Sequence, residues 1–132
     1  MYTVKKVAEI MNISVHTLRF YDNEGLFPYV SRNKNNIRLF SEHDLEWVTL
    51  VQCLRDTDMP LADIKRYIEL CMQGDTLEER YHIILKQKEK AEQEVSNMQK
   101  RVEILNTKSE LYKGLLLEQK TDKCNPQNSK LQ

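Results

Sequence analysis

The stretch Ile13-Ser14-Val15-His16-Thr17-Leu18-Arg19-Phe20-Tyr21 decides how the rest of the chain is interpreted. Ile13 and Ser14 form a turn after a short amphipathic segment, and Ser14 can cap a new helix by accepting a hydrogen bond from its first turn. Polar side chains stand early in that helix, at positions 16, 17 and 19. A helix, a short turn and a second helix with exposed donors are typical of a helix-turn-helix that reads DNA.

The neighbouring segments support this interpretation. Thr3 can cap a first helix whose nonpolar side chains recur at helical spacing from Val4 to Met11, and Asn12 ends that helix. Gly25 follows the second helix at the point where a residue with positive φ is wanted.

Residues 26–40 predict a small hairpin beside the two helices. Residues 26–30 are nonpolar and extended, residues 31–36 form a polar turn with two basic residues and three asparagines, and residues 37–40 alternate with period two. A hairpin after a helix-turn-helix is a wing, and the basic and amide side chains at its tip suit phosphate oxygens.

The distribution of charge agrees with a local basic surface. The whole chain has a formal net charge of zero. Residues 1–40 hold six Lys or Arg against three Asp or Glu, a net of +3, whereas residues 41–74 hold three against seven, a net of −4. The basic surface therefore coincides with the predicted helix-turn-helix and wing.

Two further helices complete a first domain, which we predict over residues 1–74. Ser41 and Asp44 open one of them as a capping box, and Pro60 pre-sets the first turn of the next. The side chains predicted to lie along one side of these helices are Leu45, Val48, Thr49, Gln52 and Cys53 in the first, with Trp47, Val51 and Leu54 broadening its nonpolar face, and Leu61, Ile64, Tyr67, Ile68 and Cys71 in the second.

A long helix with a heptad pattern is predicted over residues 75–118. Steps of four and three residues connect its nonpolar positions, which is typical of a coiled coil. These positions are Leu77, Tyr81, Ile84, Ala91, Val95, Met98, Val102, Leu105, Tyr112 and Leu116, with Lys88 and Ser109 as the two polar members. The helix is too long to bury this stripe on the first domain, so we expect a second copy of the chain as its partner. Residues 119–132 are polar and predicted to be a disordered tail.

Lys88 indicates how two such helices pair. In a parallel pair in register, Lys88 would face its own copy inside a nonpolar seam. An antiparallel pair in which facing residue numbers add up to 193 or to 200 places Lys88 against Leu105 or Tyr112 of the other copy, and both registers avoid that repulsion. We therefore expect an antiparallel pair and leave the two registers open.

Several classes of protein are disfavoured. The sequence has no nonpolar run of membrane-spanning length, no signal-peptide core at its start, and an odd number of cysteines. We therefore expect a cytoplasmic protein with reduced thiols. No nucleophile–base pair, phosphate loop, metal cluster or cofactor motif stands out, so an enzyme is not expected.

The quoted residues resemble the MerR family of transcriptional regulators over roughly residues 1–118. The resemblance is carried by Tyr2-Thr3-Val4, Ser14 to Tyr21, Gly25-Leu26, Ile37 to Phe40, and Cys53 to Leu61. Two positions depart from the family pattern, because Asn36 and Asp58 stand where glycine is usual or frequent. Asn and Asp tolerate positive φ better than other residues, so we expect the fold to accept both.

The resemblance implies a mainly α fold, in which a winged helix-turn-helix is followed by an antiparallel coiled-coil dimerisation helix. It implies a homodimer on a palindromic operator, where an effector changes the bend and twist of promoter DNA and so acts indirectly on RNA polymerase. The positions that match DNA-contacting residues are Ser14, Val15, His16, Thr17, Arg19 and Tyr21 in the helix-turn-helix, and Arg32, Lys34 and Arg38 in the wing. For Tyr21, packing in the core is an equal alternative.

The three cysteines raise the question of an effector. The surroundings of Cys53 resemble those in AdhR- and NmlR-type members of the family, which respond to aldehydes and other electrophile stress through one cysteine; the alternative is a buried packing residue. Cys71 is interpreted as packing and Cys124 as a free thiol in the tail, and one cysteine past the long helix is too few for a soft-metal site. A competing interpretation is a coiled-coil adaptor or accessory DNA-binding protein with this fold and no effector.

Overall fold

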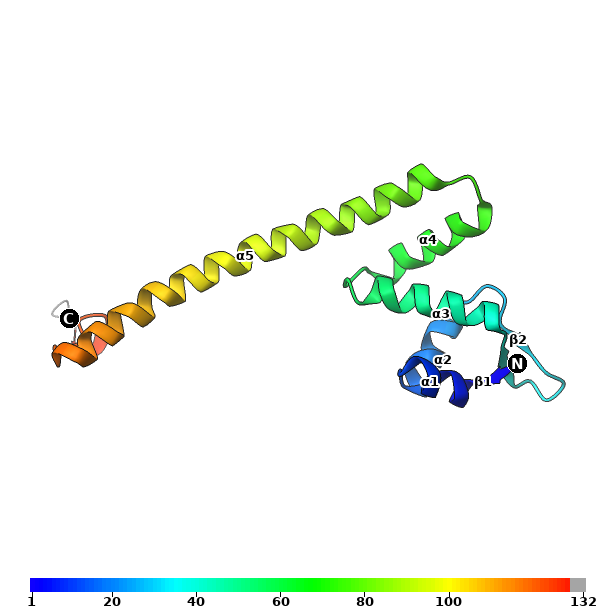
Figure 1. The fold of residues 1–132 in the computed structure, drawn as a ribbon, viewed down its shortest axis with the longest axis horizontal. Helices are drawn as coiled ribbons and strands as arrows, with labels where there is room; N and C mark the ends of the chain where they lie inside the picture. Colours follow the sequence, from blue (N-terminus) through cyan, green and yellow to red (C-terminus); the bar gives the residue numbers. More distant parts are fainter. Residues whose placement is uncertain (129–132) are drawn as a thin grey trace. The chain divides into compact units, whose positions relative to one another are not determined.

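The computed structural model describes residues 1–128, and these fall into two compact units that meet between Lys88 and Glu89. Figure 1 traces the elements in order. They are β1 (Tyr2–Thr3), α1 (Val4–Met11), α2 (Val15–Asn23), β2 (Ser31–Arg32), β3 (Arg38–Phe40), α3 (Glu42–Arg55), α4 (Leu61–Gln73), α5 (Leu77–Glu118) and a short 3-10 helix, η1 (Pro126–Asn128). The predicted mainly α fold with a winged helix-turn-helix is confirmed.

Local capping chemistry sets the ends of the first helices. The Thr3 side chain accepts a hydrogen bond from the Lys6 amide at the start of α1, and Asn12 ends that helix with φ 55°. The predicted capping box at α3 is present in full, since Ser41 and Asp44 each accept from the other's backbone N–H. After α2, Gly25 adopts φ 80°, which an L side chain would adopt only with strain.

The wing is part of a three-stranded antiparallel sheet with the order β1-β3-β2. Tyr2 pairs with Phe40, and Ser31 pairs with Leu39. The strand predicted over residues 26–30 is wrong: Leu26 and Phe27 are consecutive buried core residues, and a turn follows them, so the strand begins only at Ser31. β1 escaped prediction because two residues are too few to show a period.

One hydrophobic core holds the first unit together. Its largest fully buried side chains are Phe40, Leu18, Leu26, Met59, Ile64, Val7, Val48 and Val51. The predicted nonpolar face of α3 is confirmed at Val48, Val51 and Leu54, which are buried, and is wrong at Thr49 and Cys53, which are exposed. The helix is rotated so that Asp44, Val48 and Val51 are buried, and these positions follow one another at the steps of four and three that keep them on one side.

The first turns of α5 belong to the first unit, which runs past residue 74 to Lys88. Ile83 packs against the core, and Gln87 Nε2 donates a hydrogen bond to the Thr57 carbonyl at 2.7 Å. This contact supports the α3–α4 connection, where Asp58 has φ 61°. Asn36 in the wing has φ 62°, so the expectation that both positions accept positive φ is confirmed.

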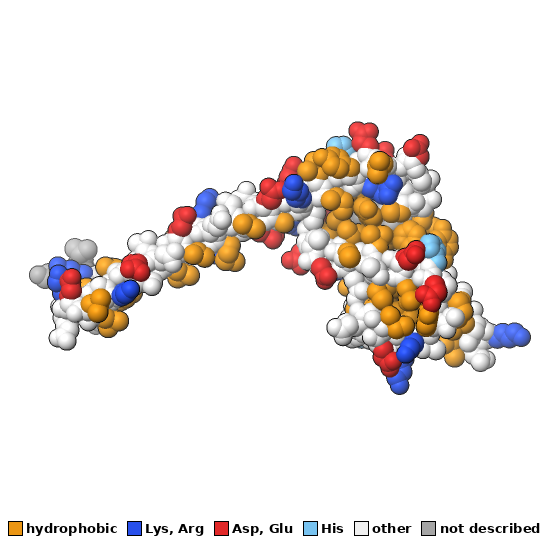
Figure 2. All heavy atoms as spheres, viewed as in Figure 1, with side chains coloured by type: hydrophobic (Ala, Val, Ile, Leu, Met, Phe, Trp, Pro, Cys, Tyr) orange, Lys and Arg blue, Asp and Glu red, His pale blue; other side chains and the backbone are white. Residues whose placement is uncertain are grey.

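No residue of α5 is buried in the single chain. Figure 2 shows hydrophobic side chains recurring along this helix. Nine of the predicted heptad positions are 41–80% exposed, namely Leu77, Tyr81, Ile84, Val95, Met98, Val102, Leu105, Tyr112 and Leu116, and Ala91 is exposed as well.

The chain turns after α5, where Gln119 has φ 53° and the Lys120 amide donates to the Leu115 carbonyl at 3.2 Å. A local turn follows, in which Asp122 accepts a hydrogen bond from the Cys124 amide. The disorder predicted for the tail stays a prediction, and its last part, residues 129–132, lies outside the described residues. Within residues 1–128, no helix combines the length and apolarity that a membrane span requires.

Candidate nucleic-acid interface

α2 is fixed on one side and open on the other. Leu18 is completely buried, and Val15 and Tyr21 are partly buried against the core. His16 and Arg19 are exposed on the remaining surface of the helix, as a DNA-reading helix requires. Tyr21 thus contributes to packing and keeps part of its side chain accessible.

Ser14 is the N-cap residue of α2. Its Oγ accepts a hydrogen bond from the Thr17 amide at 3.0 Å, and it lies 2.8 Å from Thr17 Oγ1. The cap therefore also orients the Thr17 side chain at the start of α2. This hydrogen bond restricts the rotamers of Thr17. The Thr17 side chain can reach the edge of a DNA base only if the first turn of α2 enters a groove.

The wing tip is ordered by its own hydrogen bonds. Asn33 Oδ1 accepts from the backbone amides of Asn35 and Ile37, at 2.9 and 3.0 Å. Arg32 Nη1 donates to the Asn36 carbonyl at 3.0 Å, which keeps the guanidinium beside the turn. Lys34 is exposed at the tip, so its ammonium projects into solvent.

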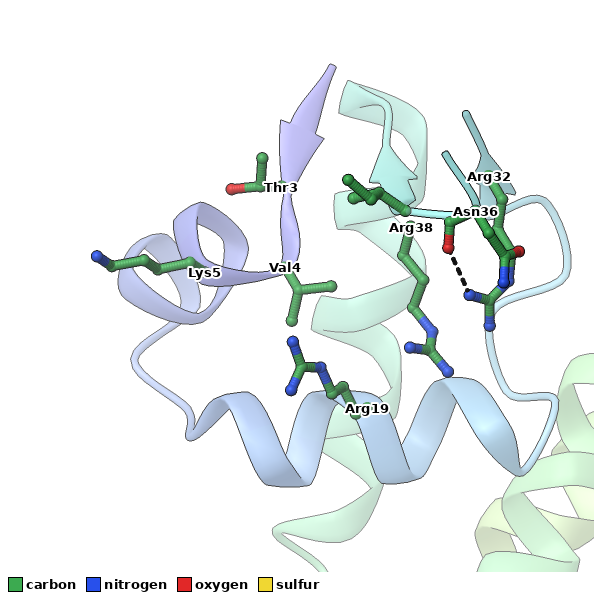
Figure 3. A pocket seen from close by; sticks show the side chains of 8 residues that line it. Thr3, Val4, Lys5, Arg19, Arg32, Asn36 and Arg38 are labelled. Carbon is green, nitrogen blue, oxygen red and sulfur yellow. Dashed lines mark hydrogen bonds between the residues drawn. The ribbon is translucent and has the colours of Figure 1, made fainter. Parts of the chain in front are cut away.

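A hollow of about 330 Å³ lies where α1, α2 and the wing meet. Its lining residues are Thr3, Val4, Lys5, Arg19, Arg32, Asn36, Ile37 and Arg38. Figure 3 shows Arg19 rising from α2 and Arg38 reaching down from β3 toward the same space, whereas the Lys5 side chain points away from it. Three predicted DNA-contacting arginines are thus brought together, in a setting suited to phosphate oxygens.

Arg38 differs from the other two arginines because its guanidinium has a partner within the chain. It forms an ion pair with Asp22 and a hydrogen bond with Asn23, both at the end of α2. The side chains of Arg38 and Asp22 are only 15% and 13% exposed. Arg38 therefore ties the wing to the end of α2, and its predicted contact with DNA stays a prediction.

Two surface residues were missed from the sequence. Lys5 lines the hollow, and its position two residues after the capping residue Thr3, in the first turn of α1, was the available signal. Phe20 is 42% exposed, with its ring centroid 6.0 Å from that of Tyr21. Phe20 directly follows Arg19 and lies outside the buried side of α2. Helical periodicity alone could therefore have predicted that Phe20 is exposed.

A further contact ties β1 to the start of α3. The Tyr2 hydroxyl donates a hydrogen bond to Glu42. That hydrogen bond, and then the negative charge of Glu42, raise the pKa of Tyr2 above its usual value of 10.0. The neutral phenol of Tyr2 is therefore the form that makes this hydrogen bond between β1 and the start of α3.

The cysteines are distributed over different environments. Cys53 is exposed, so the alternative that it is a buried packing residue is wrong for the single chain. Cys71 is partly buried, and Arg80 Nη1 lies 4.0 Å from its Sγ. Cys124 is exposed, and among the described residues no three His, Cys, Asp or Glu side chains gather as a metal site would require.

Comparisons with known proteins agree with this geometry. The model of the MerR HTH family regulatory proteins matches residues 2–71. An uncharacterized HTH-type transcriptional regulator of Haemophilus influenzae is 41% identical over 112 residues, covering 84% of this chain and 83% of the relative. The transcriptional regulator AdhR of Bacillus subtilis is 30% identical over 88 residues, covering 66% of this chain and 63% of AdhR.

A solved structure extends the similarity beyond the matched domain. HiNmlR, a MerR family regulator lacking the sensor domain and crystallised bound to promoter DNA, is 39% identical and aligns with a TM-score of 0.69. The alignment covers 88% of this chain and 93% of HiNmlR. The chain belongs to the MerR family, whose members are DNA-binding transcriptional regulators and not enzymes.

Proposed function

We propose that this regulator acts as a homodimer, held by an antiparallel pair of α5 helices, on a promoter operator with two inverted half-sites. In this proposal each winged helix-turn-helix binds one half-site, and the pair changes the bend and twist of the DNA between them. RNA polymerase then responds to the altered promoter shape, so the regulator acts on it through the DNA.

The observation that carries the proposal is the uncovered stripe of α5. Nine large nonpolar side chains at heptad spacing are 41–80% exposed, which a soluble helix does not keep open to water. A second copy of the chain supplies an identical stripe. In a two-fold symmetric pair, the stripe of each copy covers the stripe of the other. One reading unit covers one half-site, so a symmetric pair needs a symmetric operator.

The roles of the surface residues follow from their settings. His16 and Thr17, early in α2, are proposed to contact base edges together with Val15, and Ser14 supports them as the cap. Arg19, Arg32, Lys34 and the hydroxyl of Tyr21 are proposed to contact the DNA backbone. Arg38 is proposed to position the wing through Asp22, with direct DNA contact as its secondary role.

The test compares base-reading and backbone-contacting variants on one operator, which is first selected from random duplexes. His16→Ala should reduce the ratio of operator to random-DNA affinity by about tenfold, because a lost base contact costs roughly 1–3 kcal/mol. Arg32→Ala should weaken binding to both DNAs alike and lower the salt slope by about one. Equal losses on both DNAs from the two variants would contradict the assignment of base reading to His16.

The competing adaptor function is tested in the same titration. A regulator with the proposed backbone contacts binds random duplex DNA at low salt and loses affinity as salt rises. Absence of binding at low salt would favour an adaptor with this fold and no role at promoters. Sedimentation of the full chain gives the oligomeric state, and a monomer at micromolar concentration would contradict the homodimer.

A second part of the proposal concerns the effector. We propose that Cys53 reacts with an aldehyde or another electrophile, because its thiol is exposed near the end of α3 and AdhR is among the relatives. Cys53→Ser should abolish aldehyde-induced transcription while leaving operator binding unchanged. Cys124→Ser is the matched control, since its thiol is also exposed. Induction that persists in Cys53→Ser would exclude this thiol as the sensor.

A further inference from the structure

We propose that the two α5 helices pair in a single register, in which the numbers of facing core residues add up to 193. This inference rests on the proposed homodimer and specifies its interface. In this register the two-fold axis lies between Val95 and Met98, so that each of these residues faces the other in the second copy. Lys88 faces Leu105, and Ser109 faces Ile84.

Coverage of nonpolar surface favours this register. It pairs all twelve heptad positions, from Leu77 against Leu116 at each end to the centre. The antiparallel register with the sum 200 begins at Ile84 and leaves Leu77 and Tyr81 without a facing residue. These two side chains are 75% and 58% exposed, so that register leaves two of the larger nonpolar surfaces of the stripe in water.

Charges beside the core also distinguish the registers. The core positions of a heptad alternate between a and d, and here the a positions are residues 81, 88, 95, 102, 109 and 116, and the d positions are residues 77, 84, 91, 98, 105 and 112. In an antiparallel coil, the residue before each a position faces a residue of the same kind in the other helix, and so does the residue after each d position. With the sum 193, Glu94 faces Arg101 of the second copy, and Glu78 faces Lys113. Two-fold symmetry produces each attractive pair twice, and none of the facing flank positions carries like charges.

The sum 200 produces a different charge pattern. Arg101 then meets Arg101 of the second copy at the two-fold axis, and Glu94 meets Lys108. Both Glu94 and Arg101 are exposed and take part in no ion pair within the described residues. Their side chains are therefore available to a partner, and only the sum 193 makes them partners of each other.

The surface of α5 is hollowed where this register needs space. A hollow of about 660 Å³ at the helix start is lined by Leu77 and Tyr81 with the acidic side chains Asp75, Glu78 and Glu79. In the proposed register the facing segment of the second copy contains Lys113 and Leu116, a basic and a nonpolar side chain that complement this lining. A second hollow of about 530 Å³ is lined by Val95, Met98 and Val102 with Gln99 and Glu103, and it lies beside the two-fold axis in both antiparallel registers.

Cross-linking of the full chain tests the register directly. The background carries Cys53→Ser, Cys71→Ser and Cys124→Ser, and its dimeric state and helix content are first confirmed by sedimentation and circular dichroism. Two double variants are then oxidised, one with Ile84→Cys and Ser109→Cys and the other with Ala91→Cys and Ser109→Cys. The first pair faces across the sum 193, and the second across the sum 200.

The expected result is a covalent dimer from the first variant, with a peptide joining positions 84 and 109, and only background cross-linking from the second. Preferential joining of positions 91 and 109 would replace the proposed register by its neighbour. A 109–109 link from Ser109→Cys alone would indicate a parallel pair. A dimer that joins none of these positions would also overturn the register, whereas a monomer would overturn the homodimer itself.

A charge exchange provides a second, non-covalent measurement. Glu94→Arg and Arg101→Glu should each weaken dimerisation on the order of tenfold, because two exposed pairs change from attraction to repulsion. The double variant should recover the original dissociation constant. In the register with the sum 200 the double variant would bring the two carboxylates introduced at position 101 face to face and would not recover. Glu89→Arg, on the outward side of the helix, is the control and should leave dimerisation unchanged.

Discussion

Replacing Asp22 with asparagine separates two roles for Arg38, the anchor of the wing and a direct contact to DNA. Asp22→Asn removes the negative charge from the pair at the end of α2 and keeps the size of the side chain. It leaves the guanidinium of Arg38 in place but without its counter-charge. Arg38→Gln removes the other member of the same pair.

The burial of the pair sets the size of the effect. With side chains 15% and 13% exposed, the pair lies between surface ion pairs, worth at most about 1 kcal/mol, and buried ones, whose disruption costs about 3–5 kcal/mol. We therefore expect Asp22→Asn to lower the free energy of unfolding by about 2 kcal/mol. Since Arg38 also bonds to Asn23, Arg38→Gln should cost at least as much, and the double variant should cost less than the sum by about 1 kcal/mol.

Urea denaturation gives the stabilities, and DNA titrations over a range of salt give the affinity and its slope. If Arg38 mainly anchors the wing, Asp22→Asn lowers DNA affinity with the salt slope unchanged, because all phosphate-contacting side chains remain. Arg38→Gln lowers the affinity with a change of slope well below one, because its direct contact with DNA is secondary. Arg32→Gln is the control: it should change stability by less than about 0.5 kcal/mol and lower the slope. The anchoring role is refuted if Asp22→Asn leaves stability unchanged while Arg38→Gln alone lowers the slope by about one.

Three further predictions concern other parts of the first unit. The chain truncated after Lys88 should fold as a monomer and bind the operator far more weakly than the full chain; a dimer by sedimentation would contradict the role of α5. Asp58→Ala should lower the free energy of unfolding by about 1 kcal/mol and Asp58→Gly should not, because residue 58 has φ 61°, which strains alanine and not glycine. Equal effects of the two variants in urea denaturation would contradict this backbone strain. The raised pKa of Tyr2 means that its hydrogen bond to Glu42 stabilises the fold below pH 10 and is lost as the phenol ionises above it. Tyr2→Phe should therefore differ from the parent near neutral pH and converge with it in alkaline solution, and a constant difference would exclude this linkage.

Features governed by neighbours in sequence could be predicted. The caps at Thr3, Ser14 and Ser41 depend on side chains that bond to amides three residues on, and all three are present in the structure. Positive φ at Asn36 and Asp58 followed from the short list of residues that tolerate it. These rules act within one turn of chain, so a single sequence contains all the information they need.

Features that depend on distant partners could not be predicted. The ion pair of Arg38 is one such feature, because Asp22 lies 16 residues away and only the folded chain brings the two side chains together. The place of Cys53 on α3 was misjudged for a similar reason. Nonpolar residues occur on more than one side of that helix, and the packing of α1, β3 and α4 around it decides that Val48 and Val51 are buried and Cys53 is not.

The proposed register also fixes the operator that this regulator can bind. Moving from the sum 193 to the sum 200 shifts the two-fold axis by half a heptad along α5, about 5 Å at 1.5 Å per residue. Because both copies shift, the first turns of the two α5 helices would separate by about 10 Å along the coil. For a coil that runs along the DNA axis, this distance corresponds to roughly three base pairs at 3.4 Å each. Three base pairs also rotate one half-site by almost a third of a helical turn relative to the other, so a dimer in the wrong register could not place both α2 helices in the major groove on one side of the same operator. In the proposed dimer, the unpaired residues Leu77 and Tyr81 and the repulsion at Arg101 would therefore influence DNA recognition as well as dimer stability, because they disfavour the register with the sum 200 and its different half-site spacing.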